Sequence, residues 1–360
     1  MWTNLGMIAH SRPTLSEEEA KAVHDVVLSN YISEGKWVKA FEDSVAKYIG
    51  CKYAVVVNSG TSALQLTLLA LGVNKGDEVI IPAYTCTGIY YAVKAAGAVP
   101  VVVDVSEKNF SPAPKAVMQK ITPKTRAIVC VHTFGIAAPL GGLLSLNIPV
   151  IEDCAHSVGS SYNGKKIGSF GAASIYSFYA TKMMTTGEGG MVLTNSQAVA
   201  DTVRQIKTAD STKNDKETRF NYKLTDMQAA MGLVQLRKLD DFIKRRRQIA
   251  KRYNQAFEDL TGIEVPQRDE EHDTFYRYVI KMPNRETADL FMEKQHMGGV
   301  ICDRPYERPL YRLLQEKKSK FKNAEDCFDC LVSIPIYPSL SDGEVETVIY
   351  RCKTIFQDIL

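Results

Sequence analysis

The feature that most constrains this chain is the regular alternation of short apolar runs and amphipathic helical stretches through its first 240 residues. Helical stretches such as Ser62–Leu71 and Gly88–Ala96 separate runs that predict strands. The densest runs are β-branched, which suits strands buried on both faces. The pattern predicts an α/β fold with a mixed, mostly parallel sheet covered by helices on both sides. The predicted strands are Tyr53–Val57, Glu78–Ile81, Val101–Val103, Ala127–Val131, Pro149–Ile151, Ala173–Ser177 and Met191–Thr194.

The pattern changes after Leu239, where a long charged helix continues to about Leu260. A chain of 360 residues suits two domains of roughly 100–200 residues each. We therefore expect a large domain over 1–240 and a smaller α+β domain over 241–360, with the long helix spanning the boundary. The smaller domain is predicted to contain a strand at Tyr276–Lys281, a helix from Thr287, a strand near Gly298–Ile301 and a final helix from Asp342.

Composition excludes several classes of protein. The net charge is only +3, and the basic run Lys244–Arg247 lies in the long helix, so we expect no nucleic-acid partner. No apolar run approaches the roughly 18 residues of a membrane span. The eight cysteines form no paired zinc-ligand pattern, and the lone Cys327-x-x-Cys330 predicts helix packing, so no metal is expected. A polar N-terminus and this cysteine usage favour a reducing cytoplasm.

The first chemical motif is Asn58–Leu64, which follows a predicted strand and opens a helix. Gly60 permits a sharp turn, and Thr61 and Ser62 can cap the helix. Free N–H groups and hydroxyls at a helix start form an anion site suited to phosphate. An ordinary N-cap is the competing interpretation. The motif lacks the Gly-Lys-Thr of a nucleotide-binding loop and the glycine spacing of a dinucleotide fold.

Two further motifs place charges at strand ends. In Val150–His156 a short apolar strand ends in two acids, and the carboxyl end of a parallel strand is where α/β sheets hold ligand groups. A strand ending near Ser177 leads to Lys182, which is soon followed by Gly187–Gly190. A lysine amine in an apolar site can attack carbonyl carbons. Taken singly, a strand-end charge and a surface lysine remain open alternatives.

The three motifs together fit one cofactor. A phosphate-binding helix start, an Asp for a pyridinium nitrogen and a Schiff-base lysine are the minimal set for pyridoxal 5'-phosphate (PLP). Asp153 keeps the ring nitrogen protonated in this hypothesis. Lys182 carries the cofactor and then acts as the general base.

The chain resembles the sugar aminotransferases of PLP fold type I, the DegT/DnrJ/EryC1/StrS family, over nearly its whole length. The resemblance implies an aspartate-aminotransferase-like large domain and a homodimer whose active site is shared between subunits. It rests on Tyr31–Gly35, Ser59–Leu64, Gly76–Val79, Pro82–Thr85, Glu152–His156, Ser177-Phe178 with Lys182, Gly187–Gly190, Asn221–Lys223 and Ser333–Pro335.

Roles follow for individual residues by this resemblance. Gly60, Thr61 and Ser177 are expected at the cofactor phosphate, Ser62 among the cofactor-binding residues, and His156 near the cofactor's phenolic oxygen. Asn221 matches a position that reaches the phosphate of the neighbouring subunit.

The chain departs from the family at two positions. Cys86 stands where many members have an aromatic residue on the PLP ring, so its sulfur, Tyr84 or another aromatic must cover the ring. Lys223 stands where many members have Arg, which differs in anion binding. The candidate substrate residues are Ser33, Tyr84, Lys223 and Arg304.

The expected reaction is transfer of an amino group, from L-glutamate as in much of the family, to a keto group of a nucleotide-linked sugar. A cyclitol or another non-nucleotide keto sugar is the alternative acceptor. A non-catalytic PLP-binding regulator is a further alternative, but such a protein does not need Lys182. Relatives that replace this lysine with histidine are sugar dehydratases, so Lys182 favours amino transfer.

Overall fold

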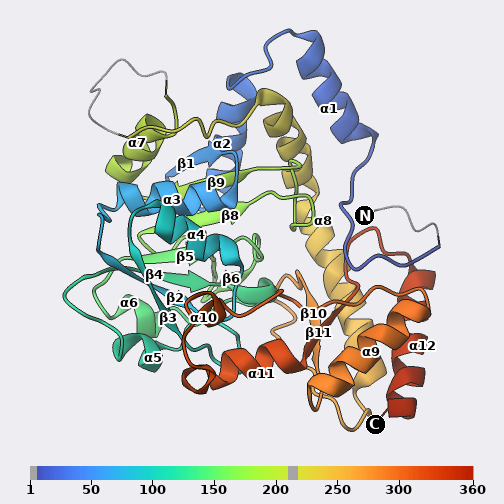
Figure 1. Ribbon diagram of the computed structural model, residues 1–360. Coiled ribbons are helices and arrows are strands. Elements are labelled where there is room, and N and C mark those ends of the chain that lie inside the picture. The colour runs from blue at the N-terminus through green and yellow to red at the C-terminus, as the bar shows by residue number, and fades with distance from the viewer. Residues whose placement is uncertain (1–5, 210–217, 360) are drawn as a thin grey trace.

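The computed structural model describes residues 6–209 and 218–359 (Figure 1). The helices are α1 Glu17–Leu28, α2 Lys36–Ile49, α3 Gly60–Ala70, α4 Thr87–Ala95, α5 Pro114–Met118, α6 Gly141–Leu144, α7 Gln197–Ile206, α8 Asp226–Phe257, α9 Arg285–Met297, α10 Leu310–Leu313, α11 Lys322–Cys330 and α12 Asp342–Ile359. The strands are β1 Tyr53–Val57, β2 Glu78–Pro82, β3 Val99–Val103, β4 Thr125–Val131, β5 Val150–Asp153, β6 Ser161–Tyr162, β7 Lys165–Lys166, β8 Ala173–Ser177, β9 Gly190–Thr194, β10 Tyr278–Lys281 and β11 Leu331–Ile334.

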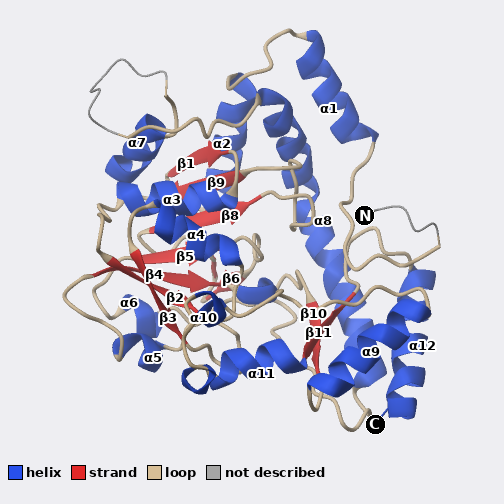
Figure 2. Cartoon of the chain, in the orientation of Figure 1, coloured by secondary structure: helices blue, strands red, loops and turns tan. Residues whose placement is uncertain are grey.

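A seven-stranded sheet in the order β1-β9-β8-β5-β4-β2-β3 forms the centre of the larger part of the molecule (Figure 2). Only β9 runs antiparallel to its neighbours, and the remaining pairs are parallel. All seven strands coincide with predicted runs to within two residues, so the predicted mixed, mostly parallel α/β sheet is confirmed. Pro100 lies in the edge strand β3, where a missing N–H costs no sheet hydrogen bond.

Helices cover both faces of this sheet because successive side chains of each strand point to opposite sides. In β1, Val55 and Val57 join an apolar core with α3, α4 and α7, whereas Ala54 and Val56 join a core with α2 and α8. A smaller cluster with α5 and α6 covers the β2–β5 side of the sheet. The carboxyl ends of the parallel strands therefore open along one edge of a rigid, buried sheet.

The second part of the molecule has its own apolar core. It joins the end of α8 with α9, α12 and the two-stranded sheet β10-β11, and Ile8 of the N-terminal segment packs into it. The predicted boundary at residue 240 falls inside α8, which is continuous over 32 residues. The division into two domains remains a prediction, which the separate core supports.

One predicted strand is wrong. Around Gly298–Ile301, only Val300 forms a bridge, to Ile8, because Gly298 and Gly299 terminate α9 and Gly299 has a φ of +80°. The partner of β10 is instead β11. The prediction for Cys327 and Cys330 is confirmed, since both are buried on α11. Within the described residues, no helix is both long and apolar enough to cross a bilayer.

Candidate active site

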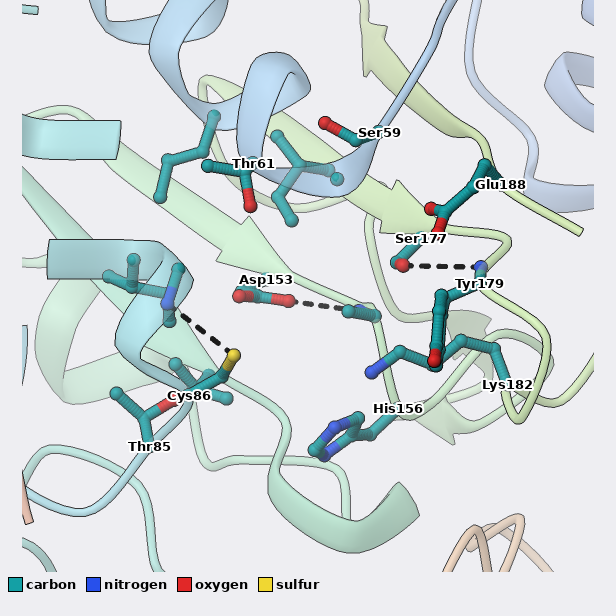
Figure 3. A pocket seen from close by; sticks show the side chains of 17 residues that line it. Ser59, Thr61, Thr85, Cys86, Asp153, His156, Ser177, Tyr179, Lys182 and Glu188 are labelled. Atoms are coloured by element: carbon teal, nitrogen blue, oxygen red, sulfur yellow. Dashed lines mark hydrogen bonds between the residues drawn. The ribbon is translucent and has the colours of Figure 1, made fainter. Parts of the chain in front are cut away.

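A pocket of about 260 Å³ opens at the carboxyl edge of the central sheet (Figure 3). Val131, Asp153 and Ile175 stand side by side in register on β4, β5 and β8, and all three line the pocket. Residues of the α3 and α4 starts and of the loop after β8 complete the wall. The sheet therefore fixes the floor of the pocket, and loops supply its polar groups.

The first turn of α3 forms one wall. Ser59 is the N-cap, and its Oγ accepts a hydrogen bond from the Ser62 N–H at 3.1 Å. The N–H groups of a first helical turn lack intrahelical partners and attract anions. Gly60 is required here because an added Cβ would lie 2.9 Å from the Cβ of Ser177. Gly60, Thr61 and Ser177, which are predicted to bind the cofactor, line the pocket, whereas Ser62 is buried behind Ser59.

Asp153 lies buried on the pocket floor at the end of β5. Its Oδ1 accepts a hydrogen bond from the Ala155 N–H at 2.9 Å. Burial raises the pKa of the carboxyl, and the Ala155 N–H and the Lys182 charge oppose that rise. A buried acid without a full counter-charge is suited to hold a cationic ring nitrogen.

The neighbouring Glu152 has a structural role instead. Its Oε2 accepts from Gly168 N–H at 2.7 Å and from His132 Nε2 at 3.1 Å, and Oε1 accepts from two further backbone N–H groups. Burial would raise the pKa of Glu152, but these hydrogen bonds, led by that of His132, hold it below its ordinary value.

His132, Glu152 and Cys154 are the only described residues whose grouping could suggest a metal site. The Nδ1 of His132 accepts from the Ala138 N–H at 3.0 Å, so its Nε2 carries the proton and donates to Glu152. No lone pair of this histidine remains for an ion, and the geometry gives no support for a metal there.

Lys182 follows β8 in a turn closed by its own N–H, which donates to the Tyr179 carbonyl at 2.9 Å. Figure 3 shows the side chain extending its amine toward the space between Asp153 and His156. The Nζ lies 5.2 Å from the centre of the Tyr276 ring, within cation–π range. The glycines that follow Lys182 return the chain to the sheet. Gly190 must be glycine, because an added Cβ would overlap the backbone of Ser59.

His156 lies beside this amine. Its ring stacks on Tyr276 with 4.2 Å between centroids, and Nδ1 is 3.5 Å from the hydroxyl of Tyr306. Burial, together with the charges of Lys182 and Arg277, holds the pKa of His156 well below its ordinary value. The imidazole is therefore neutral near pH 7.

Cys86 is the N-cap of α4, and its Sγ accepts from the Gly88 N–H at 3.5 Å while lining the pocket. Tyr84 lies behind this wall. It is fully buried and packs edge-on against Tyr306, with 4.9 Å between ring centres. Of the two residues considered for covering the cofactor ring, Cys86 alone faces the pocket.

Besides Ser62 and Tyr84, four further predicted residues lie outside the pocket lining of their own chain, namely Ser33, Asn221, Lys223 and Arg304. Ser33 and Asn221 are exposed. Arg304 is engaged within the protein, because it pairs with Asp289 at 2.6 Å and donates to the carbonyl of Asp329 at 2.7 Å.

The pocket also contains residues that the sequence did not single out. Ser59, Thr85, Tyr179 and Glu188 line it. Ser59, Thr85 and Glu188 stand inside motifs already quoted, so their neighbours were the available signal. Tyr276 and Tyr306 follow α8 in the sequence, and their rings lie against the ring of His156. No sequence signal links segments that are 120 residues or more apart.

The residues present fit pyridoxal phosphate. The α3 start supplies N–H groups for a phosphate, Asp153 supplies a buried acceptor for the ring nitrogen, and Lys182 supplies the amine. The sheet order and this arrangement of charges define a PLP-dependent enzyme of fold type I.

Comparison with known proteins narrows that class. Residues 13–353 match the model of the DegT/DnrJ/EryC1/StrS aminotransferase family. A GDP-perosamine synthase of Escherichia coli O157:H7 is 35% identical over 96% of each chain, and the spore coat polysaccharide biosynthesis protein SpsC of Bacillus subtilis is 32% identical over 97% of each. The PMP-form structure of a putative sugar aminotransferase from Streptococcus pneumoniae, Spr1654, superposes with a TM-score of 0.93 at 27% identity over 98% of each chain.

The chain belongs to the DegT/DnrJ/EryC1/StrS aminotransferase family. It is a PLP-dependent aminotransferase, as the family resemblance implied.

Proposed function

We propose that this aminotransferase moves an amino group from L-glutamate to the keto group of a nucleotide-linked sugar. The observation that carries the proposal is a single pocket that holds the Lys182 amine, the Asp153 carboxylate and the first turn of α3. The acceptor class is supported by the 35%-identical relative, whose name contains a GDP-linked sugar. A keto sugar without a nucleotide, or a cyclitol, is the alternative acceptor.

The residues of the pocket divide the work. Bound PLP supplies an electron-withdrawing ring that acidifies the α-proton of an amine attached to it. Lys182 Nζ is the attachment point for the cofactor and the base that moves the proton at the substrate carbon. Asp153 holds the proton on the ring nitrogen, and Gly60, Thr61 and Ser177 bind the phosphate. Neutral His156 would lie near the cofactor's phenolic oxygen and would add no charge there.

Some of the predicted residues that lie outside the pocket of their own chain fit a site shared between two subunits. We place Asn221 at the cofactor phosphate of a neighbouring subunit in a homodimer, and Ser33 and Lys223 near the acceptor. The exposure of Asn221 and its position outside its own pocket support this placement. The cytoplasm is the proposed compartment, supported by eight free thiols that include the exposed Cys86.

The test has two steps. Purified protein supplied with PLP should show a visible absorbance band, and borohydride reduction followed by peptide mass spectrometry should locate the adduct on Lys182. A panel of keto-sugar nucleotides and free keto sugars is then supplied with L-glutamate, and 2-oxoglutarate is measured. We expect turnover with at least one nucleotide-linked keto sugar.

Lys182→Ala should abolish both the band and the turnover. A matched control is Lys166→Ala, which removes another half-buried lysine of the same domain outside the pocket. No band in the wild type would refute the assignment of Lys182. Turnover confined to free sugars or cyclitols would replace the proposed acceptor.

A further inference from the structure

Arg277 lies immediately before β10, where the second apolar core meets the active-site pocket. It lines a small cavity of about 130 Å³ together with His10, Thr181, Tyr276 and Ser333. Thr181 and Tyr276 link this cavity to the active site, because one precedes Lys182 and the other lies under its amine. The cavity therefore adjoins the reaction centre.

The guanidinium of Arg277 has few partners. One terminal nitrogen lies 3.1 Å from Nε2 of His10, while the buried Nε has no hydrogen-bond partner. Its carbon stands 5.5 Å from the centre of the Tyr276 ring, the ring that also contacts Lys182 Nζ. Among residues 6–209 and 218–359, no carboxylate forms an ion pair with it.

The partner that Arg277 does have carries no negative charge. Burial, with the Arg277 charge, holds the pKa of His10 well below its ordinary value, so the imidazole is neutral. Its Nε2 also meets the hydroxyl of Ser333 at 2.8 Å. Arg277 is half-buried, and a cation withdrawn from water is costly unless an anion compensates it. The chain places a neutral acceptor where a counter-ion would serve stability better.

Neighbouring arginines show how this chain satisfies a buried guanidinium that has only a structural role. Arg268 pairs with Asp273 at 3.0 Å, and Arg246 donates to three backbone carbonyls. Arg277 receives neither arrangement, although it is the one of the three that lines a cavity beside Lys182.

We propose that Arg277 is the binding residue for a carboxylate of the amino-acid donor. The planar fork of a guanidinium matches a carboxylate with two parallel hydrogen bonds. A donor whose amine is at Lys182 can direct a carboxylate across the edge of Tyr276 into this cavity, since both cations lie against one ring. The inference rests on the proposed amino transfer and adds the group that selects the donor.

The test measures binding without turnover. Maleate, an unreactive dicarboxylate, is titrated into the PLP-loaded enzyme by calorimetry, and a nucleoside diphosphate is titrated separately. Arg277→Gln should raise the Kd of maleate by about 10-fold to 100-fold, because a charge-assisted hydrogen bond is lost. The Kd of the nucleoside diphosphate should stay unchanged.

A second variant keeps the guanidinium and remains informative if Arg277→Gln fails to fold. His10→Asp places a carboxylate of the protein itself beside Arg277, so maleate should bind about 10-fold or more weakly while the melting temperature holds or rises. The matched control is Arg351→Gln, since Arg351 also has a buried unpartnered Nε but lies against Gly298 in the second core. It should leave the Kd of maleate unchanged.

Three results would overturn the inference. They are no maleate binding by the wild type, an unchanged maleate Kd in the folded variants, and a loss confined to the nucleoside diphosphate. Because maleate binding needs no acceptor sugar, a failed acceptor screen would refute the proposed function while leaving this measurement intact.

Discussion

At the scale of single residues, Asp153 sets function against stability. Burial raises its pKa, and a group whose folded pKa is raised loses stabilisation as the pH rises through that value. Asp153→Asn keeps an acceptor for the Ala155 N–H and removes the buried charge. We expect the free energy of unfolding of the cofactor-free protein near pH 8 to be unchanged or about 1 kcal/mol higher. Amino transfer should fall about 100-fold to 1000-fold.

Urea unfolding and single-turnover kinetics on the same preparation measure the two quantities. A parallel loss of stability and activity would instead assign Asp153 a packing role. The amide of Asp153→Asn reproduces the shape of the carboxyl without its charge, so the comparison with the wild type isolates the effect of the charge.

His156 gives a second prediction at this scale, on pH dependence. The folded pKa is lowered below the ordinary 6.5, so the unfolded chain binds a proton that the folded chain refuses. Stability must then fall as the pH drops below 6.5, by up to about 1.4 kcal/mol per pH unit. His10 contributes in the same sense. His156→Gln should reduce the slope of the free energy of unfolding against pH by the contribution of about one proton. Urea unfolding at several pH values between about 7.5 and 5 measures this slope.

The sequence predicted the pocket residues that belong to strand ends and helix starts. Asp153, Lys182 and Gly60 sit where parallel-sheet topology must bring them together, so motif order was sufficient. Tyr276 and Arg277 were not predicted, because their position depends on how the second core packs against the central sheet, and no local sequence pattern encodes that packing. Ser62 was predicted to bind the cofactor together with its neighbours. Its N–H instead donates to the Oγ of Ser59.

At the scale of elements, one buried acid joins α1 to α8. Glu19 is 1% exposed and accepts from Gln235 at 2.8 Å, Lys238 at 3.1 Å and the Ser16 N–H at 2.8 Å. Burial opposes ionisation, but the hydrogen bonds of Gln235 and Ser16 lower the pKa of Glu19 to about 2. Its stabilisation is therefore present above pH 4.5 and lost as the pH falls toward 2.

Glu19→Gln should lower the free energy of unfolding at pH 7 by about 1–3 kcal/mol, because charge-assisted hydrogen bonds become neutral ones. The exposed Glu17→Gln, in the same helical turn, should change it by less than about 0.5 kcal/mol. Equal effects in chemical denaturation would show that the anchor is not the carboxylate of Glu19.

Strand prediction succeeded in the central sheet, even for the three-residue runs Val101–Val103 and Pro149–Ile151, and failed at two segments of the second part of the chain. The segment Leu331–Ile334 forms β11 although it holds only four residues and follows α11 directly. The segment Gly298–Ile301 is similarly apolar at its end, but its two glycines turn the chain away from β10. Pairing partners decided both cases, and the sequence does not specify partners.

At the scale of the whole molecule, the active site lies where two apolar cores meet. Helix α8 contributes Leu239 and Ile243 to a core of the central sheet, and Ile249 and Tyr253 to the second core. A continuous helix buried in both parts limits their relative motion. The aromatic contact of Tyr276 with His156 is thereby held in place, and the sequence could indicate this helix without indicating the contact.

The proposed homodimer offers the last prediction, also at the scale of the whole molecule. If each site combines Lys182 of one subunit with Asn221 of the other, Lys182→Ala and Asn221→Ala dimers are each inactive. Mixing after mild unfolding gives about half heterodimers, each with one intact and one doubly altered site. Activity should then return to about one quarter of the wild type. A site built within one chain forbids any recovery, because every pocket in the mixture then carries a defect, so turnover in the remixed sample distinguishes the two arrangements.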